Sequence, residues 1–240
     1  MRPDGDLLHT YRAGTAHVDA FLRDYAFLLQ AAVDLYEATF KPTWIDRAES
    51  LAAEMTEKLW DDEAGGFFSR AGGGHEALVR EKDAHDGAVP AGNAIAAHAL
   101  LRLGTLTMND ACRTKGERAL RLFVTRVERG PQAYARLLCA ADFHLGPRRE
   151  IVVAGQHGEA ATERLLAAVR SRYLPDAVVA AVRPGSDIAG RAIRRVPMLA
   201  GRELVDGRPA AYVCENYACR RPVTTPEELA ELLAKRWEKE

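Results

Sequence analysis

The chain has 240 residues, of which 48% are hydrophobic, so it is long enough and apolar enough to fold around a packed core. Its 33 Lys and Arg residues balance 34 Asp and Glu residues, and the formal net charge of -1 argues against binding to nucleic acid or to an anionic membrane surface. Apolar runs such as AVVAAV are far shorter than the roughly 20 residues of a membrane span, and the first residues resemble no targeting segment, so we expect a cytoplasmic protein.

The first part of the chain has the periodicity of helices. Apolar residues recur at spacings of three and four between about His17 and Phe40, which predicts a long amphipathic helix. A second helix is predicted to begin at Pro42 and to end at the glycines that follow Trp60. The link between the two is so short that they must form a hairpin.

Three further helices are predicted downstream. One opens at Pro90 and is expected to end at Gly104, one runs from about Asp110 to Arg126, and one follows Gly130. Paired helices joined by loops of alternating length either pack as a bundle or close into a toroid.

The pattern changes after residue 146. The run REIVVAG, a helical segment and the run AVVAAV predict a βαβ unit, and residues 209–215 are a candidate third strand. Thr225, Pro226 and Glu228 form a capping box that opens a last helix. We therefore expect a mainly α chain with a helical-hairpin region at 1–146 and a small α/β region at 147–240.

The segment EKDAHDGAVPAGN is the most site-like part of the sequence. His85 would transfer a proton near neutral pH and Asp86 would act as acid, base or hydroxyl acceptor, so this pair is the predicted catalytic group. The alternative is that Asp86 caps the following helix and Gly87 supplies a turn, which explains the same residues without a substrate.

Three further residues are candidates for binding a substrate: Asp24, Asn93 and Trp44. Asp24 and Glu37 share a long helix, and a glycosidase needs two carboxylates about 5 to 10 Å apart. The alternative interpretation pairs Asp24 with an arginine such as Arg23. Trp44 would stack on a sugar ring, although its position on an apolar stripe favours the core.

We predict no metal and no cofactor. The segment VAGQHGEAATERLL runs from strand through a glycine loop to helix, but it lacks the glycine pattern of a dinucleotide site and the lysine of a P-loop. No metal-ligand spacing connects His9, His17, His75, His98, His144 and His157.

The cysteines near the end of the chain lie in YVCENYACRRP. Cys214 and Cys219 are not a C-x-x-C pair and have no second pair with which to complete a zinc site. Structural packing is the favoured interpretation, and a reversible disulfide formed by a turn at Asn216 makes the pair a redox candidate. Cys112 and Cys139 are expected to be buried thiols.

Three stretches together carry a resemblance: FLRDYAFLLQAAVDLYEAT, then DDEAGGFF with DGAVPAGNAIA, and finally YVCENYACRRPVTTPEEL. In this order they resemble the carboxy-terminal part of the spermatogenesis-associated, YyaL-type family of thioredoxin-domain-containing proteins, over residues 5–233. The resemblance implies a partial (α/α)6 toroid of the six-hairpin glycosidase type, with carbohydrate-linked or redox-linked biology.

Two features depart from that family. The thioredoxin-like domain and the first helical hairpins have no counterpart here, and Ala91 stands where the family pattern more often has serine. We therefore expect a carboxy-terminal fragment whose unpartnered apolar helix faces cause self-association or require a missing partner.

Two functions from different classes remain open. The first is a sugar-handling module that binds a sugar-like small molecule, either as an isomerase or epimerase using His85 and Asp86 or as a hydrolase using a carboxylate pair. The second is a non-catalytic domain that recruits substrates for a thioredoxin-like partner. The sequence does not decide whether the chain is an enzyme.

Overall fold

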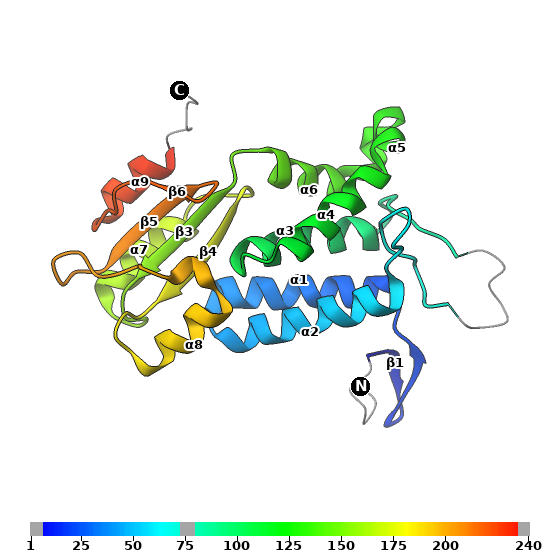
Figure 1. Cartoon of the computed structure of the whole chain (residues 1–240), viewed down its shortest axis with the longest axis horizontal. Coiled ribbons are helices and arrows are strands. Elements are labelled where there is room, and N and C mark those ends of the chain that lie inside the picture. Colours follow the sequence, from blue (N-terminus) through cyan, green and yellow to red (C-terminus); the bar gives the residue numbers. More distant parts are fainter. Residues whose placement is uncertain (1–6, 73–79, 235–240) are drawn as a thin grey trace.

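The computed structural model describes residues 7–72 and 80–234 (Figure 1), and the fold is mainly helical, as predicted, with two small sheets. The helices are α1 (Leu22–Thr39), α2 (Pro42–Leu59), α3 (Gly92–Leu106), α4 (Asp110–Leu122), α5 (Val124–Arg129), α6 (Ala135–Leu145), α7 (Ala160–Arg170), α8 (Asp187–Arg195) and α9 (Pro226–Ala234). The strands are β1 (Leu8–Arg12), β2 (Thr15–Asp19), β3 (Arg149–Ala154), β4 (Ala177–Val182), β5 (Ala210–Glu215) and β6 (Ala218–Cys219). None of the helices in these described ranges combines the length and the apolarity that a membrane crossing requires.

The helices of the first part of the chain pack as two hairpins, α1–α2 and α3–α4, with α6 beside the second. Phe40 adopts a left-handed conformation that ends α1, and Pro42 begins α2, so the predicted first hairpin is confirmed. The second hairpin is α3 with α4, and α1 and α6 both pack against α3 (Figure 1). The toroid itself stays a prediction.

Three helices differ from their predictions. The one expected from about Asp110 to Arg126 is interrupted at Phe123, between α4 and α5. The first helix begins at Leu22 rather than near His17, because residues 8–19 form the β1–β2 hairpin. Gly104 lies inside α3 instead of ending it. The residue is glycine for another reason, because a Cβ there would come within 2.6 Å of Arg113 Cγ and 2.9 Å of the Asn109 carbonyl. This glycine is therefore a point of close approach between α3 and the start of α4.

The larger sheet has the strand order β4-β3-β5-β6. Strands β3 and β4 are parallel and joined through α7, which confirms the predicted βαβ unit, and β5 is the predicted third strand, antiparallel to β3. Alternate residues of β3 face opposite sides. Ile151 and Val153 join a core with α7 and α9, whereas Val152 and Ala154 join the core of α1 and α3.

The last helix begins as its capping box predicts. Thr225 Oγ1 accepts the amide of Glu228 at 3.3 Å, and Leu229 and Leu233 are buried against the sheet. The sheet lies beside the carboxy-terminal ends of α1 and α3, so the opposite end of the helices is left for the long loops (Figure 1).

Candidate functional site

The amino-terminal ends of α1 and α3 meet the β1–β2 hairpin and Ser69, Arg70 and Asp83 of the loop before α3, and together they line a hollow of about 260 Å³. We call it the α1–α3 hollow. The two helices approach closely here, because a Cβ on Gly92 would lie 2.9 Å from Leu22 Cγ. The hollow is lined by His9, Phe21, Leu22, Arg23, Asp24, Ser69, Arg70, Asp83 and Gly92.

Asp24 is held at the edge of the hollow by two hydrogen bonds to the same oxygen. Its Oδ2 accepts the backbone amide of Phe21 at 2.8 Å and lies 2.8 Å from His9 Nδ1. The first contact closes the amino-terminal turn of α1, and the second joins the helix to β1. Among the described residues, the side chain paired with Asp24 is thus His9 and not Arg23.

An aromatic ring, a guanidinium group and a second carboxylate complete the lining. The ring of Phe21 packs edge-on against His9 at 4.7 Å, and the guanidinium of Arg70 lies 5.4 Å from the ring centroid of Phe21. Asp83 accepts the amide of His85 at 2.8 Å through Oδ1. The hollow therefore offers acceptors, cationic donors and one apolar face.

Asn93 positions the loops around the hollow. Its Oδ1 accepts the amide of Phe67 at 2.8 Å, and its Nδ2 donates to the carbonyls of Phe67 and Asp83, each at 2.9 Å. The side chain is completely buried. Its amide thus holds Asp83 at the hollow, and direct contact of Asn93 with a substrate stays a prediction.

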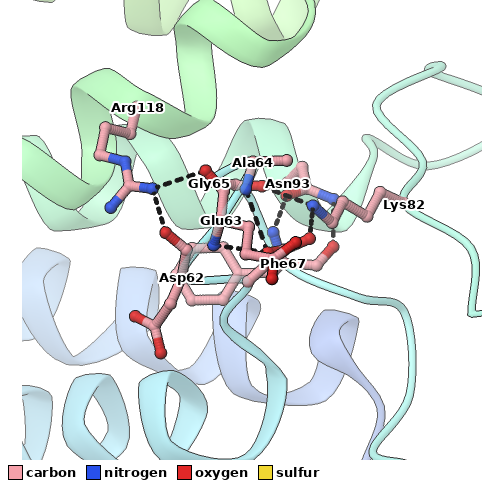
Figure 2. Close-up of polar contacts among 9 residues, drawn as sticks. Asp62, Glu63, Ala64, Gly65, Phe67, Lys82, Asn93 and Arg118 are labelled. Atoms are coloured by element: carbon pink, nitrogen blue, oxygen red, sulfur yellow. Dashed lines mark hydrogen bonds and ion pairs between the residues drawn. The ribbon is translucent and has the colours of Figure 1, made fainter.

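A polar network folds the DDEAGG turn beside Asn93 (Figure 2). Lys82 Nζ pairs with Asp61 Oδ2 at 2.5 Å and donates to the Gly65 carbonyl at 2.7 Å, and its hydrogen bond lowers the pKa of Asp61. Figure 2 shows Arg118 reaching from α4 to the carbonyls of Asp62 and Glu63, while the carboxylate of Asp62 points away. These charges serve the turn rather than a ligand.

Asp86 links the residue before α3 to the first turn of α6. Its Oδ1 accepts the amide of Ala91 at 2.9 Å, before α3, and its Oδ2 accepts the amide of Arg136 at 2.7 Å, in α6. These bonds give Asp86 a structural role, as the alternative to catalysis expected, although α3 itself has no side-chain cap and the second amide belongs to a different helix. His85 is exposed, with its ring 6.0 Å from that of Tyr134, and catalysis by the pair stays a prediction.

Trp44 and Trp60, the tryptophans of the described ranges, do not line the hollow. Trp44 is half-buried on α2 and packs against the main core. Trp60 packs edge-on against Phe67 at 4.9 Å, beneath the guanidinium of Arg118 at 5.2 Å. Stacking of Trp44 on a sugar therefore has no geometric support at this hollow.

The cysteines differ from their predictions. Cys214 and Cys219 form a disulfide, which was the less favoured alternative to structural packing. The reason is a tight turn that places the two residues opposite each other in β5 and β6. Cys139 is exposed on the outer side of α6, whereas Cys112 is half-buried and burial raises its pKa to about 11.

Two titratable groups lie away from the hollow. Burial raises the pKa of Glu37 to about 7, although Arg102 opposes the shift with Nη2 lying 3.1 Å from Oε1. His98 is buried beside Phe143, and burial lowers its pKa to about 3.

Within the described ranges, no three His, Cys, Asp or Glu residues form a group that could hold a metal ion. His75 lies outside the described residues.

Larger hollows occur elsewhere. One of about 320 Å³ is lined by Glu37, whose carboxylate pairs with Arg102, and by residues of α7 and β4. Another, of about 640 Å³, lies where β3, β4 and α9 meet. Its Arg149 donates to the Leu233 carbonyl at 2.9 Å and lies near Asp176, so both charges fasten α9 and the strand ends. Chemistry rather than volume therefore selects the α1–α3 hollow.

Sequence reasoning missed His9, Arg70 and Ser69 at this hollow. His9 lies in a strand with mostly exposed residues, which carries no alternation of apolar and polar positions. Ser69 and Arg70 follow the DDEAGGFF motif, and only the fold brings them to α1. The DDEAGGFF motif was therefore the one sequence signal that could have indicated Ser69 and Arg70.

No family model matches the chain. Over 214 residues it is 35% identical to spermatogenesis-associated protein 20 of Rattus norvegicus and of Homo sapiens, a match that covers 89% of this chain and 27% of each relative. An uncharacterised protein of Caenorhabditis elegans is 29% identical over 227 residues, which cover 92% of the chain and 30% of that protein.

The chain thus spans about a quarter of the length of the curated relatives that it matches. The identity extends over most of this chain and agrees with the resemblance found in its motifs. The chain is a homologue of one segment of spermatogenesis-associated protein 20.

Proposed function

We propose that the chain binds a sugar-like small molecule in the α1–α3 hollow. The observation that carries the proposal is the convergence of Asp24, Asp83, His9, Arg70 and Phe21 on one hollow of about 260 Å³. Its volume lies just below the usual range of about 300 to 1,000 Å³ for ligand sites, which suits a single sugar ring better than an oligosaccharide.

Each lining group has a part in recognising such a ligand. Sugar hydroxyls donate hydrogen bonds to carboxylates and accept them from guanidinium groups. Asp24 and Asp83 would therefore accept hydrogen bonds from the sugar hydroxyls, and Arg70 would donate to them. The Phe21 ring offers a surface for the apolar face of the sugar ring. His9 fixes one oxygen of Asp24, which leaves Oδ1 for the ligand.

The proposal is recognition rather than turnover. Both oxygens of Asp86, the predicted catalytic carboxylate, accept backbone amides, and its neighbour His85 is exposed. The resemblance to six-hairpin glycosidase-like proteins supports the ligand class and does not prescribe a reaction.

Isothermal titration with neutral, amino and uronic monosaccharides tests the proposal. Asp83→Asn keeps an acceptor for the His85 amide, and Asp24→Asn keeps one for the Phe21 amide, so both variants should fold. Each should weaken the affinity of the best ligand by about tenfold or more, since hydrogen bonds to a charged group contribute roughly 1.5 to 3 kcal/mol.

Asp187→Asn is the matched control, because Asp187 is an exposed carboxylate in the first turn of α8. It should bind like the unaltered chain. The absence of binding by every sugar class, or an equal loss in the control, would overturn the proposal.

A further inference from the structure

The hairpin of β5 and β6 ends the larger sheet and carries the disulfide. Cys214 and Cys219 are directly opposed, with their Cα atoms 3.9 Å apart, below the usual range of about 4.4 to 6.8 Å. Cys214 is only 2% exposed, whereas Cys219 lies on the exposed edge of the sheet. One half of the bond is therefore accessible to a reagent in solution.

The turn between the cysteines is held in an uncommon conformation. Asn216 and Tyr217 both have positive φ, 50° and 66°, which is costly for a bulky residue such as tyrosine. The amide of Tyr217 donates to Glu150 Oε2 at 3.0 Å, and its hydroxyl accepts from Arg113 of α4 at 3.1 Å. The disulfide and these contacts together oppose relaxation of the turn.

One guanidinium group contacts both sulfur atoms. Arg202 Nη2 lies 3.1 Å from Cys219 Sγ and 3.6 Å from Cys214 Sγ. Its position is fixed by donation from Nε to the Met198 carbonyl at 3.3 Å and by the Tyr212 ring at 5.1 Å. A fixed cation beside a sulfur atom stabilises the thiolate that forms when the disulfide opens.

We propose that Cys214–Cys219 is a thiol–disulfide exchange site, opened by a dithiol reductant that attacks Cys219 and assisted by Arg202. One reductant thiolate bonds to Cys219 Sγ, and the bond to Cys214 breaks. Cys214 leaves with the electron pair beside Arg202 and takes up a proton.

The second thiolate of the reductant then attacks the reductant sulfur that is bonded to Cys219 Sγ in the mixed disulfide. Cys219 leaves with an electron pair beside the same guanidinium and takes up a proton. Two electrons and two protons have moved from the dithiol to the cysteine pair, and the reductant has become a disulfide. The opened turn is free to relax, which weakens the contacts of Tyr217 with Glu150 and Arg113.

The test follows the reduction of the folded protein. After oxidation with excess oxidised glutathione, the chain is treated with dithiothreitol in native buffer, and free thiols are trapped with N-ethylmaleimide and quantified by peptide mass spectrometry. Cys214 and Cys219 should become labelled together, faster than the protein unfolds globally. Hydrogen exchange at the Tyr217 amide should increase on reduction while that of β3 stays unchanged.

Arg202→Gln should slow reduction at least threefold, and Arg202→Lys, which keeps the charge, should recover most of the rate. Arg208→Gln is the control, since Arg208 is an exposed arginine six residues along the same segment. In denaturant all variants should react alike. Reduction only at the rate of unfolding, equal rates for Arg202→Gln and Arg208→Gln, or failure of the oxidised pair to form would each overturn the proposal.

Discussion

Glu37 is the residue whose chemistry most clearly makes stability depend on pH. Burial raises its pKa from 4.5 to about 7, so between these values the folded chain keeps a proton that the unfolded chain has lost. The contribution of Glu37 to the free energy of unfolding should therefore fall as pH rises through this window, by up to about 3 kcal/mol, and level off above it. The lowered pKa of His98 contributes with the opposite sign below about pH 6.5, so the contribution of Glu37 is read from the difference between the unaltered chain and a Glu37 variant.

Glu37→Gln removes this titration. Relative to the unaltered chain, the variant should gain stability as pH rises from about 5 to about 8, whatever the constant cost of its weaker contact with Arg102. Urea denaturation across that range measures the change, with the exposed Glu231→Gln on α9 as control. A pH-independent difference would contradict the buried, protonated form of Glu37.

Asp86 separates capping from catalysis. Because its carboxylate satisfies amides at the starts of α3 and α6, Asp86→Ala should lower the free energy of unfolding by about 2 kcal/mol. Monosaccharide affinity should not change. Denaturation and titration of this variant beside Asp62→Ala, whose exposed carboxylate points away from its network, measure both effects (Figure 2). Loss of a reaction with unchanged stability would favour the catalytic interpretation.

At the scale of elements, glycines report how closely the helices pack. Gly104→Ala should destabilise the chain, although alanine is the better helix former by about 1 kcal/mol, because its Cβ would meet Arg113 Cγ and the Asn109 carbonyl. Gly190→Ala on α8 meets only Arg194 Nη1 at 3.6 Å and should stabilise by roughly 0.5 to 1 kcal/mol. Thermal denaturation of the pair checks the opposite signs, and the same sign for both would contradict the packing of α3 on α4.

The elements differ in how far the sequence could predict them. Helical periodicity, the βαβ pattern and the Thr225 cap predicted most helices and strands, because each is a local signal. The β1–β2 hairpin was missed because its strands bury little, and with it His9 was lost from the site. Gly104 was misread as a helix end, since its reason is a contact with another helix.

The site was predictable only in part for the same reason. Asp24 was proposed from its place on the first helix, and it does line the hollow. Asn93 and Asp86 lie close to this end of the helices, but their polar atoms contact backbone groups distant in sequence, in the loop at Phe67 and in α6 at Arg136. No spacing rule predicts such contacts, because they depend on how the helices pair.

For the whole molecule, exposed apolar side chains on two helix faces support the expected self-association. Leu28 and Leu35 are exposed on α1, and Val124, Leu138 and Leu145 are exposed on α5 and α6. We expect concentration-dependent dimers in light scattering, and Leu138→Glu with Leu145→Glu should shift the population toward monomer. A monomer at all concentrations would contradict this expectation.

The central claim is that a sugar-like ligand occupies the α1–α3 hollow, and the most direct measurement is the imidazole NMR spectrum during titration with the best-binding monosaccharide. His9 lines this hollow, whereas His144 lines a separate apolar hollow and His157 lies beside α7. The account predicts that the His9 resonances move with saturating concentration dependence and those of His144 and His157 do not. An unchanged His9 beside a bound sugar would place the ligand elsewhere and contradict the claim.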